Sequence, residues 1–120
     1  MTPIFDRSSQ LVGWFDGEHI FGLRQQWLAF LSDGNVFSAS SSAWLGPMKD
    51  GSLLDRNGKP VAWLQGSGPS GTLKPLKPLK PLKPLKPLKP LKPLKPLKPL
   101  KPLQPLGGWS GLEWEHWLNA

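Results

Sequence analysis

One short unit is written four times between residues 4 and 66, and this repeat constrains the fold more than any other feature of the chain. A first hydrophobic block recurs at steps of 16, 16 and 17 residues, as Ile4-Phe5, Ile20-Phe21, Val36-Phe37 and Leu53-Leu54. A second block keeps the same period, as Val12-Gly13-Trp14-Phe15, Leu28-Ala29-Phe30-Leu31, Leu45-Gly46-Pro47-Met48 and Val61-Ala62-Trp63-Leu64. Turn signals follow the second block at Asp16-Gly17, Asp33-Gly34 and Asp50-Gly51, with Gln65-Gly66 as a weaker fourth.

Each unit alternates with the period of a strand, and its apolar runs are too short for helices. A small polar link joins the two strands of each unit, and Asn57-Gly58 in the fourth link predicts a type I′ turn. The sequence therefore predicts eight short strands in an antiparallel meander, an all-β fold. Four repeats avoid exposed edges by closing into a shallow barrel with pseudo-four-fold symmetry.

A column of small residues supports closure, because four equivalent backbones would approach closely there. The column follows the first residue of the second block, as Gly13, Ala29, Gly46 and Ala62. The alternative is that these residues only relieve crowding in an ordinary sandwich. Pro47 interrupts the third unit and predicts a local bulge or an edge, because proline cannot donate to a ladder.

Several of these residues carry a resemblance to a known family. The first unit reads Ile-Phe-Asp-Arg and then Val-Gly-Trp-Phe-Asp-Gly, and the fourth repeats the Asp-Arg pair as Asp55-Arg56 before Val-Ala-Trp-Leu. Over about residues 3–67 the chain resembles the bacterial four-fold β-flower domain family. The resemblance implies a petal-like barrel without catalytic residues. The third unit departs from the pattern through its all-serine link and Pro47.

Composition divides the chain into three regions, 1–67, 68–106 and 107–120. The first region is close to neutral, whereas residues 73–106 contain ten lysines and no acidic residue. The net charge of +7 therefore belongs to the middle region. The first region is not a basic nucleic-acid domain, and nucleic acid is an unexpected partner.

The middle region begins with a Gly/Ser joint and continues with ten Leu-Lys-Pro repeats over residues 73–102. A proline at every third position favours polyproline II, which makes this region a semi-rigid spacer. Its lysines form one basic edge, beginning with Lys74, Lys77, Lys80, Lys83 and Lys86. They lie about 9 Å apart in polyproline II, close to the Debye length, so attraction to anionic surfaces is expected to be weak.

The third region predicts a short amphipathic helix. Ser110 and Glu113 have the spacing of a capping box, and Trp109 and Trp114 have that of a hydrophobic staple. So short a helix is unstable alone in water, so its tryptophans need a surface. The predicted partner-binding residues are Trp109, Leu112, Trp114, Trp117 and Leu118. That surface is either a protein partner or the chain's own barrel.

Catalytic signals are weak throughout. The chain has no cysteine, and its two histidines, His19 and His116, lie in different regions. The Asp-Gly aspartates are explained by turn chemistry. We therefore expect no catalytic residues, cofactor or metal. Without a secretory signal pattern or a long apolar run, a cytoplasmic location is expected.

These observations favour a non-enzymatic interaction or adaptor protein that uses the barrel and the tryptophan-rich C-terminal segment. The alternative function is peripheral binding to anionic membrane surfaces through exposed aromatic side chains and the Lys/Leu spacer. The oligomeric state and the identity of a partner stay open.

Overall fold

The structure is a computed structural model that describes residues 2–66 and 108–119. The first range forms eight β-strands, and the second contains one short α-helix. The strands are β1 (Thr2–Asp6), β2 (Leu11–Phe15), β3 (His19–Gly22), β4 (Trp27–Ser32), β5 (Asn35–Ser38), β6 (Trp44–Lys49), β7 (Ser52–Leu54) and β8 (Pro60–Leu64). The helix is α1 (Trp114–Leu118). The predicted polyproline II spacer lies outside the described residues.

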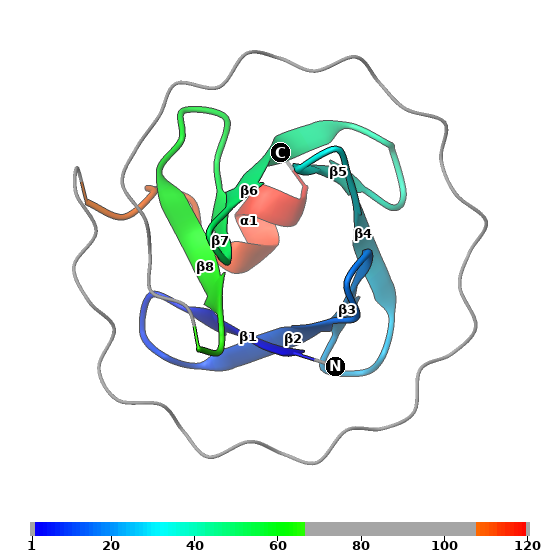
Figure 1. Cartoon of the computed structure of the whole chain (residues 1–120), viewed down its shortest axis with the longest axis horizontal. Coiled ribbons are helices and arrows are strands. Elements are labelled where there is room, and N and C mark those ends of the chain that lie inside the picture. Colours follow the sequence, from blue (N-terminus) through cyan, green and yellow to red (C-terminus); the bar gives the residue numbers. More distant parts are fainter. Residues whose placement is uncertain (1, 67–107, 120) are drawn as a thin grey trace.

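The eight strands form a closed antiparallel barrel in sequence order, and β8 pairs with β1 to complete the ring. In the closing pair, Ile4 lies opposite Leu64 and Phe5 lies opposite Trp63. Figure 1 looks down the ring, and the strands follow one another around it from blue to green. The predicted closed barrel of four hairpins is therefore confirmed, and the sandwich alternative is wrong.

Every hairpin contains a β-bulge at the same place, whereas the sequence predicted a bulge or an edge in the third unit alone. In the first hairpin Ile4 pairs with Gly13 but Phe5 pairs with Leu11, so Val12 is the extra residue. The same register shift occurs in the other three hairpins, where the extra residues are Leu28, Leu45 and Val61. A bulge bends its strand and re-aims the extra side chain. The four bulges thus give each hairpin, here called a petal, the same bend.

The third hairpin contains one of the two features expected near Pro47, a bulge, but Pro47 forms no edge. It lies within β6 and pairs with Asn35 of β5, inside the closed ring. The bulge of this unit is at Leu45, as in the other units. The third unit therefore keeps the common backbone pattern despite its deviant sequence.

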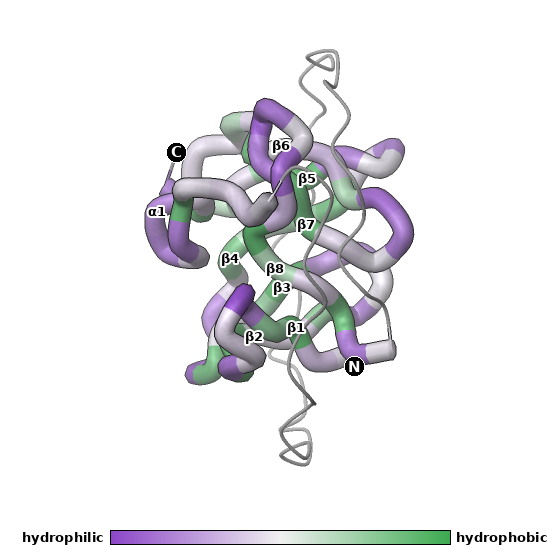
Figure 2. The backbone as a smooth tube through the Cα atoms, turned by 90° about the vertical axis from the view of Figure 1, so that its left-hand side faces the viewer, coloured by the Kyte–Doolittle hydropathy of each residue, from purple (hydrophilic) through white to green (hydrophobic). Residues whose placement is uncertain are grey.

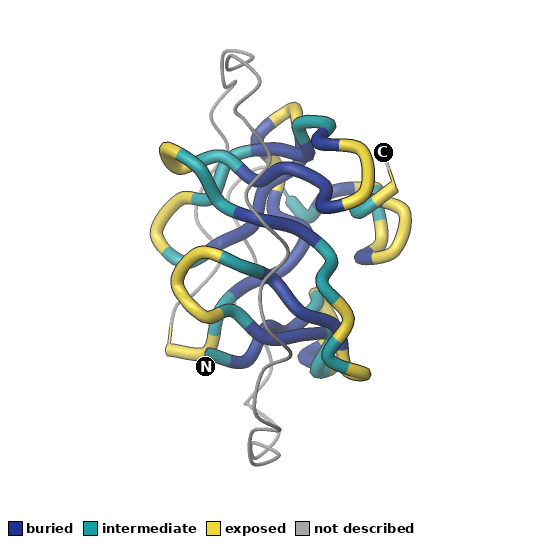
Figure 3. The backbone as a smooth tube through the Cα atoms, turned by 90° about the vertical axis from the view of Figure 1, so that its right-hand side faces the viewer, coloured by how far each residue is buried: buried dark blue, intermediate teal, exposed yellow. Residues whose placement is uncertain are grey.

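The first hydrophobic block supplies both layers of packing. Ile4, Ile20, Val36 and Leu53 are fully buried and belong to the central core. Because successive strand residues point to opposite faces, the residue after each of them lies on the other face. There, aromatic rings of adjacent hairpins pair, as in Phe5 with Trp63 and Phe30 with Phe37. Figures 2 and 3 show the hydrophobic and buried stretches in the strands and the hydrophilic, exposed stretches at the turns.

The turns follow two local designs. Asp33-Gly34 and Asp50-Gly51 both have positive φ at their two residues, as a type I′ turn requires. The type I′ turn predicted at Asn57-Gly58 is wrong, because only Gly58 has a positive φ. Instead, the Asp55 side chain accepts hydrogen bonds from the backbone N–H groups of Asn57 and Lys59 at 2.9 Å, and these hold a different turn.

The links of the first three units place a non-glycine residue in the left-handed region, where the fourth unit has Gly58. In the second link this residue is Gln25, with a φ of 64°. Because a side chain is disfavoured there, Gln25→Gly is expected to raise the free energy of unfolding by about 0.5–1 kcal/mol. Urea denaturation measures the change. The neighbouring Arg24, which is exposed and not at positive φ, is the control, and Arg24→Gly is expected to lower stability; a gain at both positions would contradict the explanation.

Candidate binding site at the mouth of the barrel

The four bulge residues lie around one end of the barrel, here called the mouth, and residues 108–119, here called the tail, dock onto it. Leu45 and Val61 are buried in the core cluster that includes two tryptophans of the tail. Val12 and Leu28 are only partly buried. In Figure 1, α1 lies across the ring on the side of β6, β7 and β8. The tail thus covers one half of a mouth that four similar petals build.

Trp117 is the anchor of the tail. It is fully buried, and its indole Nε1–H donates to two main-chain carbonyl oxygens, Leu45 O at 3.0 Å and Leu54 O at 3.1 Å. These carbonyls come from neighbouring petals, and Leu54 O also lies against the Cα of Gly46. A buried tryptophan needs a partner for its N–H group. The junction between the third and fourth petals supplies that partner twice.

Trp114 reaches the corresponding junction between the first and second petals. Its ring lies 3.4 Å from the position that a Cβ on Gly13 would occupy, and that Cβ would also lie 2.5 Å from Phe21 O. The rings of Trp114 and Trp117 pack together with their centroids 5.5 Å apart. The two indoles therefore span the mouth between opposite junctions.

The small-residue column explains why these two junctions are used. It alternates Gly13, Ala29, Gly46 and Ala62, so glycine occurs in the first and third petals. Trp114 and Trp117 each lie at a glycine junction, where no Cβ separates the backbones of two petals. The four hairpins have four-fold topology, but glycine occurs at only two of the four junctions around the mouth. One indole lies at each of these two junctions.

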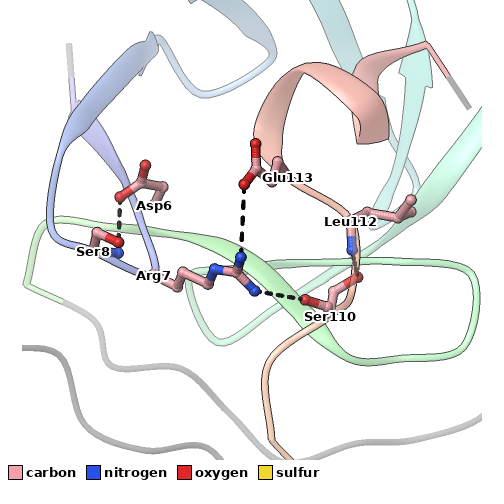
Figure 4. A network of polar contacts seen from close by, with 6 residues as sticks. All are labelled: Asp6, Arg7, Ser8, Ser110, Leu112 and Glu113. Atoms are coloured by element: carbon pink, nitrogen blue, oxygen red, sulfur yellow. Dashed lines mark hydrogen bonds and ion pairs between the residues drawn. The ribbon is translucent and has the colours of Figure 1, made fainter.

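Residues 108–113, here called the strap, precede the helix and hold the tail to the fourth petal. The buried Ser110 donates its backbone N–H to Pro60 O at 2.8 Å and its hydroxyl to Asp55 Oδ2 at 2.6 Å. Arg7 donates to Ser110 O at 3.4 Å and lies 3.7 Å from Glu113 Oε1 (Figure 4). The strap is thus fixed mainly through one buried serine.

The predicted capping box is wrong. The helix begins at Trp114, and Glu113 stands at its N-cap without a side-chain hydrogen bond. The Ser110 hydroxyl accepts from Leu112 N–H at 3.0 Å while it donates to Asp55. Because the buried carboxylate fixes Ser110 outside the helix, the helix starts later than the sequence suggested.

Removing the Ser110 hydroxyl tests this anchor. Ser110→Ala leaves the buried Asp55 oxygen without its donor, so the free energy of unfolding is expected to fall by about 2 kcal/mol. Urea unfolding followed by tryptophan fluorescence measures the loss. Glu113→Ala is the control, because its ion pair with Arg7 is exposed and weak. Similar losses in both variants would contradict the assignment.

A groove remains where the tail does not cover the mouth. It lies between α1 and the first half of the barrel and has a volume of about 700 Å³. Its apolar lining includes Val12, Leu28, Trp114 and Leu118. Its polar lining includes Arg24, Gln26, Ser38, Ser40, Glu115 and Asn119. The groove therefore presents apolar and polar side chains side by side, which suits a ligand segment that carries both.

The predicted partner-binding residues all lie in the tail, and the structure places their apolar side against the chain's own barrel. Trp114 and Trp117 are buried, whereas Trp109, Leu112 and Leu118 are half-buried. Of the two surfaces left open by the sequence, the structure therefore shows the barrel. The basic edge Lys74, Lys77, Lys80, Lys83 and Lys86 lies outside the described residues.

The groove residues of the barrel were missed by the sequence analysis. Val12 and Leu28 looked like ordinary strand residues, because a bulge leaves no mark in the hydrophobic alternation. The glycine–alanine alternation was visible in the sequence and distinguishes the junctions that hold the indoles.

The two histidines do not meet. His19 packs edge-on against Trp27, with ring centroids 5.6 Å apart, while His116 is exposed on α1. Within residues 2–66 and 108–119, no three His, Cys, Asp or Glu side chains are grouped so that they could hold a metal ion. Within the same residues, no helix is long and apolar enough to cross a membrane.

The comparisons with known proteins agree with this geometry. The family model described as 4-fold beta flower protein matches residues 2–118. The chain belongs to the 4-fold beta flower family. The beta flower match is longer than the resemblance over residues 3–67, because it extends through the tail that closes the mouth. Neither a curated protein nor a solved structure matches the chain.

Proposed function

We propose that this beta flower protein is a non-enzymatic binding protein and that its ligand site is the groove beside the docked tail. The ligand is a short segment of a protein partner with apolar side chains. One observation carries the proposal: the tail covers Leu45 and Val61 but leaves the equivalent Val12 and Leu28 half-buried on the wall of a groove of about 700 Å³.

The tail itself indicates the chemistry that suits this end of the barrel. It is a short segment whose tryptophans fill apolar junctions and whose indole N–H bonds to main-chain carbonyls. The groove offers similar bulge residues, together with a helical wall and the exposed Arg24 at its rim. A partner segment with aromatic or branched side chains would bury its apolar face there and pair its polar groups at the rim.

This proposal changes the role of the tryptophan-rich segment. Trp117 cannot contact a partner while it is buried in the mouth. The docked tail instead contributes a wall of the site through Trp114 and Leu118. Partner binding by the whole apolar face of the tail would require it to leave the mouth. The cytoplasmic location stays a prediction.

A peptide-display selection against the full chain tests the proposal. Selected peptides are expected to bind the natural chain and to lose at least about tenfold in affinity with Leu28→Lys, which puts a charge among the apolar lining residues of the groove. Asn57→Lys adds the same charge at an exposed position of the fourth link and is expected to leave affinity unchanged. Peptides that bind both variants equally, or no selected peptides at all, would overturn the proposal.

The membrane alternative also stays a prediction, and the described residues give it little surface. Among them, Leu23 is the one exposed large hydrophobic side chain, and most aromatic side chains of the barrel are buried. Flotation with anionic liposomes at low salt tests it directly.

A further inference from the structure

The chain has three arginines, and each lies in the polar link of a different petal, as Arg7, Arg24 and Arg56. Two of them are engaged with other parts of the molecule. Arg7 lies 3.7 Å from Glu113 Oε1 in the tail. The Nε–H of Arg56 donates to Trp44 O at 2.8 Å. Among the described residues, the guanidinium of Arg24 makes neither a hydrogen bond nor an ion pair.

Arg24 lines the groove from a link whose main chain is held in place. Its backbone N–H donates to Gln26 Oε1 at 3.0 Å, and Gly22 N–H donates to Gln26 O at 2.9 Å. The carboxamide of Gln26 also packs over Gly22, where an added Cβ would lie 2.5 Å from it. The guanidinium therefore starts from a fixed backbone and is available to a ligand in the groove.

The facing wall of the groove carries the opposite charge. Glu115 of α1 also lines the groove, and within the described part of the chain its carboxylate forms no ion pair with Arg24 or with any other residue. Glu115 lies in the first turn of α1, where a negative charge is favourable without a ligand. A segment between the two walls must therefore keep an acidic group on the side of the second link, away from Glu115.

The docked tail shows how a segment with apolar side chains pairs with an arginine of a link. It buries Trp114 and Trp117 in the mouth and places the carboxylate of Glu113 beside Arg7 of the first link (Figure 4). A guanidinium suits this role because its parallel N–H donors match the two oxygens of a carboxylate. Apolar contact and one acidic side chain are thus already combined in the segment that occupies the rest of the mouth.

We propose that the occupant of the groove is an acidic and apolar segment of a partner protein. An Asp or Glu side chain of this segment pairs with Arg24, while neighbouring aromatic or branched side chains contact Val12 and Leu28. The acid is a side chain inside the segment, as Glu113 is inside the tail. This charge preference rests on the proposed function, because it requires that a peptide segment occupies the groove.

Peptide display on the full chain tests the charge preference. Random peptides are displayed without a free C-terminal carboxylate, so that an enriched acid is a side chain. Peptides selected on the natural chain are expected to carry Asp or Glu beside an aromatic or branched residue at least about twofold more often than the unselected library. Selection of the same library on Arg24→Glu is expected to enrich Lys or Arg instead, because like charges repel across an interface.

The affinities of synthetic copies of the selected peptides measure the pairing with Arg24. Arg24→Gln is expected to weaken acidic peptides about three- to fivefold, the effect of an exposed pair, and Arg24→Glu at least about tenfold. An amide in place of the acid of the peptide is expected to remove the difference between the natural chain and Arg24→Gln. Lys49→Glu makes the same change of charge at an exposed position outside the groove lining, and affinity is expected to stay within about twofold. Circular dichroism confirms that each variant is folded.

The charge preference and the proposed function fail in different ways. A selection that yields no peptides would overturn both. Peptides that lose affinity with Leu28→Lys but not with Arg24→Glu would overturn the charge preference and leave the peptide site standing. Basic peptides that are weakened more by Glu115→Gln than by Arg24→Gln would also overturn it, because the recognised charge would then be that of α1.

Discussion

Trp117→Ala is expected to lower the free energy of unfolding by about 3–5 kcal/mol, the range for removing a fully buried large side chain. The loss is large because the side chain fills the mouth and satisfies two carbonyl groups, Leu45 O and Leu54 O. A domain of this size has a total stability of only about 5–15 kcal/mol. Removing one side chain from the tail is therefore expected to weaken the barrel as a whole.

Urea denaturation, monitored by circular dichroism so that loss of a fluorophore does not matter, measures this change. Trp117→Phe keeps most of the ring and removes the N–H group, so a smaller loss of about 1–2 kcal/mol is expected. Trp109→Ala removes a half-buried tryptophan from the same tail and is expected to cost about 1 kcal/mol. Equal losses at positions 109 and 117 would show that the tail is not anchored as described.

Gly46→Ala is expected to be the most damaging small substitution, with a loss of about 4 kcal/mol or a failure to fold. Its φ is 149°, and an added Cβ would overlap the main-chain oxygen of Leu54. Because that oxygen belongs to the backbone of the next petal and also accepts from Trp117, it cannot move aside without disturbing the seat of the tail.

Gly34→Ala is the matched control for this prediction. Gly34 also has a positive φ, 77°, but no atom lies within 4 Å of an added Cβ. Its loss is therefore expected to be about 1–2 kcal/mol, the cost of the left-handed conformation alone. The difference between the two variants in thermal or urea unfolding measures the close approach of the petals, and no difference would refute it.

The repeat predicted the architecture well, because closure follows from pattern and period. Four copies of one hairpin specify eight strands, and four similar edges have an obvious way to pair. The bulges could not be predicted in the same way. Val12 and its equivalents are strand-like in sequence, and only the pairing partners reveal that one residue too many lies between Leu11 and Gly13.

The tail shows the limit of sequence reasoning about a site. Its amphipathic pattern correctly predicted a helix that needs a surface, but a pattern of apolar residues does not say which surface. The predicted capping box failed because Ser110 pairs with Asp55, which lies far away in sequence. Local motifs are least reliable where a buried group elsewhere in the chain competes for the same atom.

The acceptors of the Trp117 indole have a consequence for mutation. Both oxygens are main-chain atoms, so no amino-acid replacement at positions 45 or 54 can delete them. Other apolar residues can replace the side chains around this contact, whereas the path of the backbone must stay the same. The main-chain path therefore determines whether the indole is bound. A saturation library at positions 45 and 54 is expected to keep this contact in more of its variants than a library at position 46.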